Sequence, residues 1–97
     1  MTDDHPNHQL RLYVAGDAQN SLEAMANLRE ICGKHLGGAC EIEVVDVFLQ
    51  PARAMRDGIF MTPTLVKLSP GVPRTVVGTL SDTETVLQAL ELPTRRP

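Results

Sequence analysis

The sequence has few cysteines, few aromatic residues and no excess of positive charge. In 97 residues it holds two cysteines, one tyrosine, two phenylalanines, no tryptophan and a net charge of -3 at pH 7. Without a basic field or aromatic stacking platforms it has little with which to hold a phosphate backbone, so we expect no nucleic-acid partner. Long apolar runs are also absent, and the N-terminus is acidic where a signal peptide would be basic. We therefore predict a cytoplasmic protein with no membrane segment.

Neither the cysteines nor the histidines form a redox or metal motif. Cys32 and Cys40 have seven residues between them, which is not the spacing of a CxxC pair. We therefore expect no disulfide framework, and two isolated thiols fit a reducing compartment. Cys32 is predicted to be a small buried residue on a helix face. His5 and His8 lack a third ligand and His35 falls at a helix end, so no metal is predicted.

Length and composition predict one domain. With 97 residues, of which 42% are hydrophobic, the chain can build one core but not two. Residues 9–92 carry the ordered patterns, and residues 1–8 and 93–97 are predicted to be flexible tails. A domain this small has a thin margin of stability, so an oligomer or a partner would help to stabilise it.

The first half of the chain has the pattern of a strand, a long helix and a second strand. Residues 9–15 become continuously apolar, which predicts a strand in a sheet covered on both faces. Asn20 followed by Glu23 resembles a capping box and predicts the start of a helix, which a glycine pair ends. Residues 41–48 are rich in β-branched residues, so the three elements predict a right-handed βαβ unit with parallel strands. The predicted apolar stripe of the helix is Leu22, Met25, Leu28, Cys32 and Leu36.

The second half predicts shorter elements. Pro51 suits the first turn of a short helix over residues 52–57. Residues 64–68 and 74–77 are strand-like and separated by a loop of hairpin length, so they should pair antiparallel. The Ser-x-x-Glu pattern at Ser81 predicts the start of a last helix that covers the sheet.

The resulting βαβαββα order is that of the thioredoxin fold, a single α/β domain. Pro63 lies where that fold keeps a cis-proline. The X-Pro bond costs only about 0.5 to 1 kcal/mol in the cis form, so a tight entry into a strand can hold it, and a trans proline in an ordinary turn is the alternative.

Several short motifs closely resemble the KaiB family. They are Leu12-Tyr13-Val14-Ala15-Gly16, Asn20-Ser21, Val45-Asp46-Val47, Thr62-Pro63-Thr64-Leu65, and Gly78 with Leu80-Ser81-Asp82. The match extends from about Leu10 to Leu92, nearly the whole ordered chain. No one of these motifs is specific, but their joint occurrence at the family's spacings is.

The resemblance implies a non-enzymatic regulator that docks on the ATPase ring of KaiC-type proteins. It also implies a metamorphic family, in which a thioredoxin-like form binds the ring and another form, often a tetramer, rearranges the second half of the chain. Here that half is about Gln50 to Leu92, whose weak helix and short apolar runs are typical of a segment with two packings of similar free energy. A homo-oligomer, dimer or tetramer, is therefore expected.

The resemblance places the docking surface around the short helix. Arginine is enriched at interface hot spots because its rigid fork pairs well with carboxylates, although a solvated surface is an equal alternative for each residue separately. The implied protein-binding residues are Arg53, Arg56, Asp57 and Arg74, and the implied fold-determining residues are Pro63, Gly78 and Asp82. No glycine-rich phosphate loop occurs, so we expect no cofactor on this chain and nucleotide on the partner.

Three positions depart from the family pattern. Thr79 stands where an aspartate is usual, which bears on the balance between the two folds. Thr75 and Gly58 replace residues that are commonly basic and remove charge from docking surfaces. A role in circadian timing and a role in stress regulation therefore both stay open.

Two alternative functions come from other classes. A thiol-disulfide enzyme would carry a nucleophilic cysteine after the first strand, where this chain has Gly16-Asp17-Ala18-Gln19. A glutathione-linked enzyme would need an activating hydroxyl near Pro63, for which Tyr13 and Ser21 are the candidates. The second alternative is a sensory domain like the KaiB-like input domains of histidine kinases, but no kinase module follows in this sequence.

Overall fold

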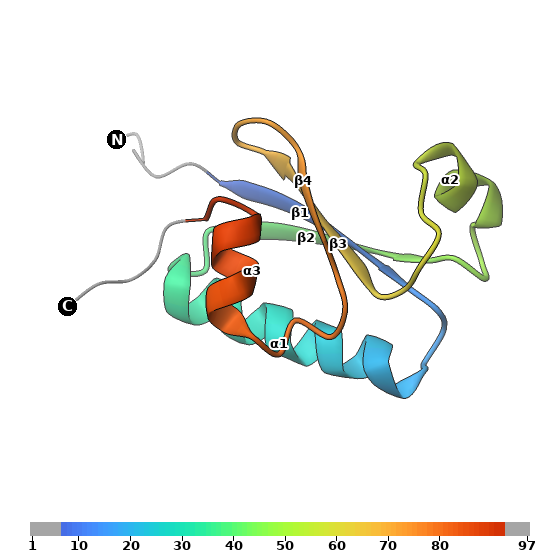
Figure 1. Ribbon diagram of the computed structural model, residues 1–97, viewed down its shortest axis with the longest axis horizontal. Coiled ribbons are helices and arrows are strands. Elements are labelled where there is room, and N and C mark those ends of the chain that lie inside the picture. Colours follow the sequence, from blue (N-terminus) through green and yellow to red (C-terminus); the bar gives the residue numbers. More distant parts are fainter. Residues whose placement is uncertain (1–6, 93–97) are drawn as a thin grey trace.

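Four strands form one mixed sheet, with α1 and α3 on one face and α2 on the other (Figure 1). The computed structural model describes residues 7–92. The elements in chain order are β1 (His8–Val14), α1 (Gln19–His35), β2 (Cys40–Asp46), α2 (Pro51–Arg56), β3 (Thr64–Ser69), β4 (Arg74–Val77) and α3 (Thr83–Ala89). This is the predicted βαβαββα order. Of the two predicted tails, residues 1–6 and 93–97 lie outside the described residues; the prediction of a tail is wrong at His8, which is buried and begins β1.

The strands pair as the sequence predicts. The sheet order is β2-β1-β3-β4, with β1 parallel to β2 and antiparallel to β3, and β4 antiparallel to β3. The long helix between β1 and β2 allows these two strands to run in the same direction, whereas a short loop is enough for the β3–β4 hairpin. β1 and β3 are therefore central, and β2 and β4 are the edges.

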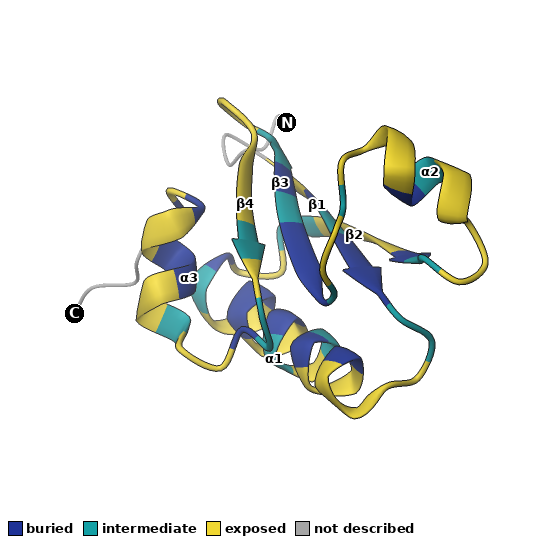
Figure 2. Cartoon of the chain, turned by 45° about the vertical axis from the view of Figure 1, so that its right-hand side comes forward, coloured by how far each residue is buried: buried dark blue, intermediate teal, exposed yellow. Residues whose placement is uncertain are grey.

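Successive residues of β1 serve different faces of the sheet because side chains alternate along a strand. Leu10, Leu12 and Val14 belong to the core cluster that also contains Leu65 of β3 and residues of α1 and α3. Figure 2 shows buried segments in the central strands and in both of these helices. Each such fully buried side chain contributes about 1.5 to 3 kcal/mol. Arg11 and Tyr13 point to the opposite face and make contacts with α2. β1 therefore presents polar, ionisable side chains on the face of the sheet opposite the core.

Helix α1 differs from the prediction in its start and in its buried face. It begins at Gln19, and no side chain caps it, so the capping box expected at Asn20 and Glu23 is wrong. Its buried residues are Ser21, Ala24, Leu28, Ile31 and Cys32, whereas Leu22 is exposed. The small side chains of Ser21 and Ala24 suit a close approach of helix to sheet, and the Ser21 Oγ accepts a 3.1 Å hydrogen bond from the N–H of Ala15. The predicted stripe is therefore right for Leu28, Cys32 and Leu36, which are buried, and wrong for Leu22.

The last helix is capped one residue later than the Ser-x-x-Glu pattern predicts. Asp82 is its N-cap, and the Asp82 Oδ1 accepts a hydrogen bond from the N–H of Thr85. The capping box expected at Ser81 and Glu84 is therefore wrong. An aspartate at this position serves a helix N-terminus as well as a serine does.

The two cysteines form a disulfide between the last turn of α1 and the first residue of β2. This corrects the expectation of two isolated thiols, although Cys32 is buried on the helix as predicted. The connection over residues 36–39 is short, so it brings the helix end back beside the strand start, with the two Cα atoms 6.3 Å apart.

The peptide bond before Pro63 is cis, as it is in the fold that the element order predicts. The bond before Pro70, in the β3–β4 hairpin, is cis as well. Within residues 7–92, no helix has the length and apolar character that a bilayer crossing requires.

Candidate functional site

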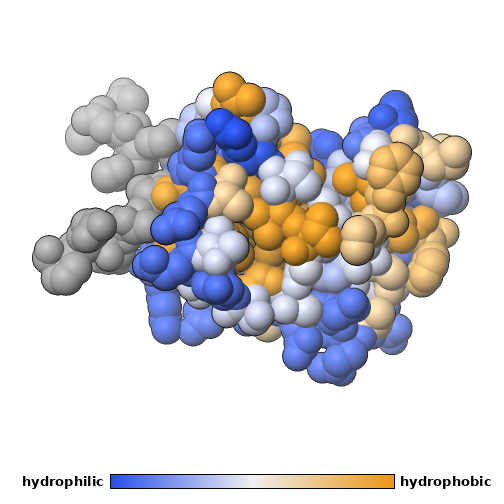
Figure 3. Space-filling view, viewed as in Figure 1, coloured by the Kyte–Doolittle hydropathy of each residue, from blue (hydrophilic) through white to orange (hydrophobic). Residues whose placement is uncertain are grey.

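Large apolar side chains are exposed around α2. Phe48 and Leu49 precede the helix, Met55 lies on it, and Phe60 and Met61 follow it; Phe60 is 92% exposed. The space-filling view shows apolar surface gathered over this part of the molecule, at the right (Figure 3). We call these five side chains together with Arg56 the α2 surface. Exposed clusters of this kind on a small domain mark sites of protein contact.

Hydrogen bonds to the Asp46 carboxylate fix the loop that leads into α2. The Asp46 Oδ1, at the end of β2, accepts hydrogen bonds from the N–H of Gly16 (3.2 Å) and of Phe48 (2.9 Å). The ring of Phe48 then lies against Gly16, where a Cβ would stand 3.4 Å from a ring carbon. Gly16 has φ +58, so this turn requires a glycine for its backbone as well. The motif residues around Asp46 thus position one end of the α2 surface.

An ion-pair network holds α2 against the sheet. The Tyr13 hydroxyl donates a 2.6 Å hydrogen bond to Asp57, directly after the helix. Arg11 and Arg53 both reach Glu43 of β2, each at 2.8 Å, and Arg11 also donates a 3.3 Å hydrogen bond to the Tyr13 hydroxyl. Since Arg11 and Glu43 are register partners on adjacent parallel strands, the sheet itself presents this pair to the helix. We call these five residues the α2 network.

The network shifts the pKa of its members in directions that favour the folded arrangement. The hydrogen bond from Tyr13 holds the pKa of Asp57 below its ordinary value of 3.8, and the hydrogen bonds from Arg53 and then Arg11 lower the pKa of Glu43 below 4.5. Burial, followed by the bond to Asp57, raises the pKa of Tyr13 above 10.0. The hydrogen bond with Tyr13, and next that with Glu43, raises the pKa of Arg11. The carboxylates are therefore ionised and Tyr13 is neutral over the physiological range.

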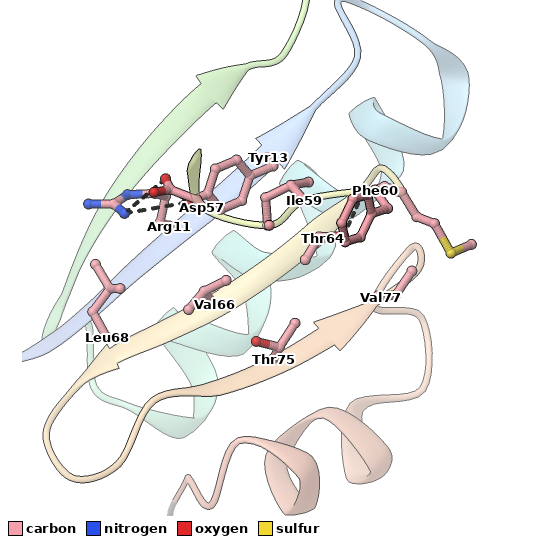
Figure 4. A pocket seen from close by; sticks show the side chains of 12 residues that line it. Arg11, Tyr13, Asp57, Ile59, Phe60, Thr64, Val66, Leu68, Thr75 and Val77 are labelled. Carbon is pink, nitrogen blue, oxygen red and sulfur yellow. Dashed lines mark hydrogen bonds and ion pairs between the residues drawn. The ribbon is translucent and has the colours of Figure 1, made fainter. Parts of the chain in front are cut away.

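A pocket of about 420 Å³ adjoins the network on the same face of the sheet (Figure 4). Val66 and Leu68 of β3 and Val77 of β4 supply the apolar part of its floor, Phe60 lies at its rim, and the network supplies its charged corner. Such a pocket suits an apolar side chain of a partner that enters beside α2.

The structure brings together three of the four predicted docking residues. Arg53 and Asp57 lie in the α2 network, and Arg56 extends from the same helix with 73% of its side chain exposed and a 3.7 Å ion pair to Asp57. Arg74 lies apart from them at the start of β4, where its guanidinium pairs with Glu91 at 2.8 Å.

The sequence reasoning did not select Arg11 or Glu43. The sequence does contain a pattern that could have identified this pair: a basic residue within an apolar strand and an acidic residue on the strand predicted to run parallel to it. Tyr13 is predicted either as a hydroxyl for catalysis or as a strand residue that packs its ring; it is buried in β1, and its hydroxyl is engaged by Asp57 and Arg11. The other hydroxyl candidate, Ser21, is fully buried and accepts from the backbone.

Two of the three predicted fold-determining residues are in contact. The N–H of Gly78 donates a 2.9 Å hydrogen bond to the carbonyl of Pro63, which joins the entry of β3 to the exit of β4. Gly78 has φ +122, a backbone conformation that side-chain-bearing residues rarely adopt. Asp82 lies further along and caps α3.

The two histidines that the structure describes lie on different elements. His8 is buried in β1, His35 ends α1 with a buried Nδ1 that has no hydrogen-bond partner, and His5 lies outside the described residues. Among residues 7–92, no three histidine, cysteine, aspartate or glutamate side chains lie close enough to hold a metal ion.

Comparisons with known proteins agree on one family. The KaiB domain model matches residues 11–92. The chain is 46% identical to the circadian clock oscillator protein KaiB of Prochlorococcus marinus strain MIT 9312 and 41% identical to the circadian clock protein KaiB3 of a Synechocystis strain. Each alignment spans 83 residues, which is 86% of this chain and 79% and 81% of the respective relatives.

Solved structures agree on the fold. The N-terminal domain of Synechococcus elongatus SasA superposes with a TM-score of 0.72 at 23% identity, covering 94% of this chain and 89% of that domain. The thioredoxin Deadhead of Drosophila melanogaster superposes with a TM-score of 0.68 at 16% identity, covering 89% of this chain and 81% of the other. The thioredoxin-like fold predicted from the element order is therefore confirmed.

Proposed function

This chain belongs to the KaiB family, and on that premise we propose that it is a non-enzymatic regulator that binds a KaiC-type ATPase ring. The curated relatives are named as circadian clock proteins, so timing is the role we favour over stress regulation. We place the protein in the cytoplasm, with nucleotide bound by the partner.

The observation that carries the proposal is the α2 surface. Phe48, Met55 and Phe60 are large, apolar and exposed, and the α2 network fixes the short helix between them on the sheet. Apolar anchors next to an exposed guanidinium are the composition of an interface hot spot, because the anchors lose water on docking and the arginine supplies directional hydrogen bonds. Arg56 supplies this guanidinium, with 73% of its side chain exposed and a 3.7 Å ion pair to Asp57.

A partner that buries this surface gains both shape and charge contacts. The pocket beside Phe60 accepts an apolar side chain, and Arg56 would pair with a carboxylate at the edge. Such a partner needs an acidic residue flanked by an apolar one. Double-mutant cycles that combine a substitution in this chain with one in the partner test this requirement.

We extend the proposal to the two folds that the resemblance implies for the family, because α2 and β4 in the second half of this chain bury fewer residues than α1 does in the first half. α1 has 17 residues and buries five of them, whereas α2 has six and buries only Ala54, and β4 is an exposed edge of four residues. Fewer buried groups lower the cost of rearranging residues 50–92, so we propose that this half has a second packing and that this packing forms the oligomer.

The test is size-exclusion chromatography of the full chain with a candidate KaiC-type ATPase, with and without ATP. We expect co-elution with the ring in at least one nucleotide state, and the elution volume of the free chain reports its oligomeric state. Separate elution in both states, under conditions in which a KaiB relative co-elutes with its own ring, would contradict the proposal. A thiol-transfer assay on the free chain tests the enzymatic alternative.

A further inference from the structure

The disulfide lies at the end of the molecule that the proposed docking function does not use. It joins the last turn of α1 to the first residue of β2, whereas the α2 surface follows the other end of β2. With 17 residues, α1 is about 25 Å long, and this length separates the bond from the Gly16–Gln19 turn. The bond is therefore not a displaced thioredoxin pair, and its role must be sought in its own surroundings.

The two sulfur-bearing residues differ in their access to solvent. Cys32 is 8% exposed, while Cys40 is partly exposed at the start of an edge strand. The neighbouring turn contains Gly37 and Gly38, which are exposed and have open space where a Cβ would stand. Cys40 is therefore the more exposed of the two, and we expect a small thiol to approach it from the side of this turn, whereas Cys32 is buried.

We propose that the Cys32–Cys40 pair is a reversible redox-modification site that exchanges with a low-molecular-weight thiol of the glutathione class, entering at the sulfur of Cys40. The attacking thiolate forms a bond to the Cys40 Sγ, the Cys32–Cys40 bond breaks, and its electron pair leaves on the Cys32 Sγ, which takes up a proton. A second thiol then attacks the mixed disulfide and releases Cys40 as a thiol. In sum, two small thiols are oxidised to one small disulfide, and one protein disulfide is reduced to two thiols.

The proposed cytoplasmic location favours a reversible bond. Disulfides that form in a reducing compartment are for the most part transient, catalytic or redox-sensing. This pair lies away from the proposed docking surface, so of these roles sensing is the one that its place in the fold suits. The proposal does not depend on the identity of the ATPase.

Opening the bond acts first on the beginning of β2. This strand is an edge, and Val45 is its only buried residue. Glu43 and Asp46 anchor its later part through side-chain contacts. Its first residue, Cys40, is held by the disulfide, by contact with the core, by an N–H bond to the Gly38 carbonyl and by the pairing with β1 at His8. Reduction removes a covalent constraint from a short loop, so the first ladder bonds of β2 open more often while the rest of the sheet keeps its protection.

The first experiment equilibrates the full chain in glutathione buffers of graded redox ratio, stops exchange with acid, alkylates the free thiols and measures intact mass. We expect one two-electron transition between a form with two thiols and a form with none. Two free thiols at every ratio, including pure oxidised glutathione, would overturn the proposal. Two bonded cysteines that resist excess reduced glutathione would overturn it as well.

Two single variants test the direction of attack. In Cys32→Ser the accessible Cys40 is left alone, and we expect it to take up one glutathione from oxidised glutathione. In Cys40→Ser the buried Cys32 is left alone, and we expect about tenfold slower uptake. Equal rates, or faster uptake at Cys32, would contradict entry at Cys40.

Hydrogen exchange of the wild-type chain tests the consequence and needs no variant. Between the oxidised and the reduced form, amides of residues 40–42 should exchange about tenfold faster after reduction, and amides of β3, in the centre of the sheet, should change little. Equal exchange of residues 40–42 in the two forms would refute the coupling of the bond to β2.

Discussion

The Tyr13 hydroxyl donates a 2.6 Å hydrogen bond to the Asp57 Oδ2 and thereby connects the central strand β1 to the end of α2. Tyr13 belongs to the first half of the chain, whose long helix and strands favour a single fold. Asp57 belongs to the second half, which we propose can rearrange. This contact is one of the few side-chain bonds that cross the junction, so it reports directly on how firmly α2 is held.

Removing that hydroxyl should loosen α2 in a pH-dependent manner. We expect Tyr13→Phe to keep the ring packing and to lower the melting temperature at pH 7 by about 4 to 8 °C. The pKa of Asp57 is lowered in the folded chain, so its contribution is present above the ordinary value of 3.8 and is lost as pH falls through the lowered pKa. The pKa of Tyr13 is raised, so its contribution is present below 10.0 and is lost as pH rises through the raised pKa.

Thermal melts from acid to alkaline pH measure this effect. The gap between wild type and Tyr13→Phe should be widest at neutral pH and should narrow at both ends of the range. In the Asp57→Asn background, where the side chain keeps its shape but has no charge, the gap between tyrosine and phenylalanine at position 13 should already be narrow at neutral pH. A gap that is constant over the whole range would show that the hydroxyl is not coupled to Asp57.

Charge reversal should separate the two arginines of α2. Arg53 pairs with Glu43 and Asp57 and is 22% exposed, so Arg53→Glu places a third carboxylate among two others and should lower the melting temperature. Arg56 is 73% exposed, so Arg56→Glu should leave the melting temperature within a few degrees and weaken binding to the ring by about tenfold. Melting and binding isotherms for both variants test this. Binding by Arg56→Glu at wild-type affinity would remove Arg56 from the docking surface.

A matched pair of apolar positions tests the α2 surface itself. Phe60 is 92% exposed beside α2, and Val72 is 66% exposed in the β3–β4 hairpin, so neither side chain supports the core. We expect Phe60→Asp to raise the Kd for the ring by about tenfold or more and Val72→Asp to leave it nearly unchanged, with both variants folded by circular dichroism. If Val72→Asp weakens binding as much as Phe60→Asp does, the docking surface lies elsewhere or the effect is only one of net charge.

The sequence predicted those parts of the fold that depend on long-range pattern. The apolar run of β1, the β-branched run of β2 and the length of the helix between them were enough to assign a parallel pair, because a strand, a helix and a strand in this order favour a right-handed crossover. The position of Pro63 before β3 followed from the same order. The resemblance to the KaiB family predicts a docking site near α2 with Arg53, Arg56, Asp57 and Arg74, of which the structure brings the first three together; that they bind a partner stays a prediction.

What the sequence did not predict depends on local geometry. The buried face of α1 contains Ser21 and Ala24 and leaves Leu22 outside, because the distance between helix and sheet, rather than apolarity, decides which side chains fit. The disulfide depends on how a short loop returns the chain, and a spacing of seven residues does not specify that path. Arg74 is predicted to belong with the α2 residues to one docking surface, but it lies at the start of β4 and its guanidinium pairs with Glu91.

The N-cap of α3 offers a direct comparison between the sequence pattern and the structure. The pattern selects Ser81, whereas in the structure the Asp82 Oδ1 accepts the N–H of Thr85 and the Ser81 Oγ accepts only from the hydroxyl of Thr79. We therefore expect Asp82→Ala to lower the free energy of unfolding by about 1 kcal/mol, since an N–H of the first turn loses its acceptor. Ser81→Ala should change it by less than about 0.5 kcal/mol, as is usual for an exposed position. Urea titrations of both variants measure the two values, and a larger loss for Ser81→Ala would return the cap to the serine. Because α3 has seven residues and buries Val86 and Leu87 against the sheet, a loss at Asp82 also weakens the packing that holds the second half of the chain in its present fold.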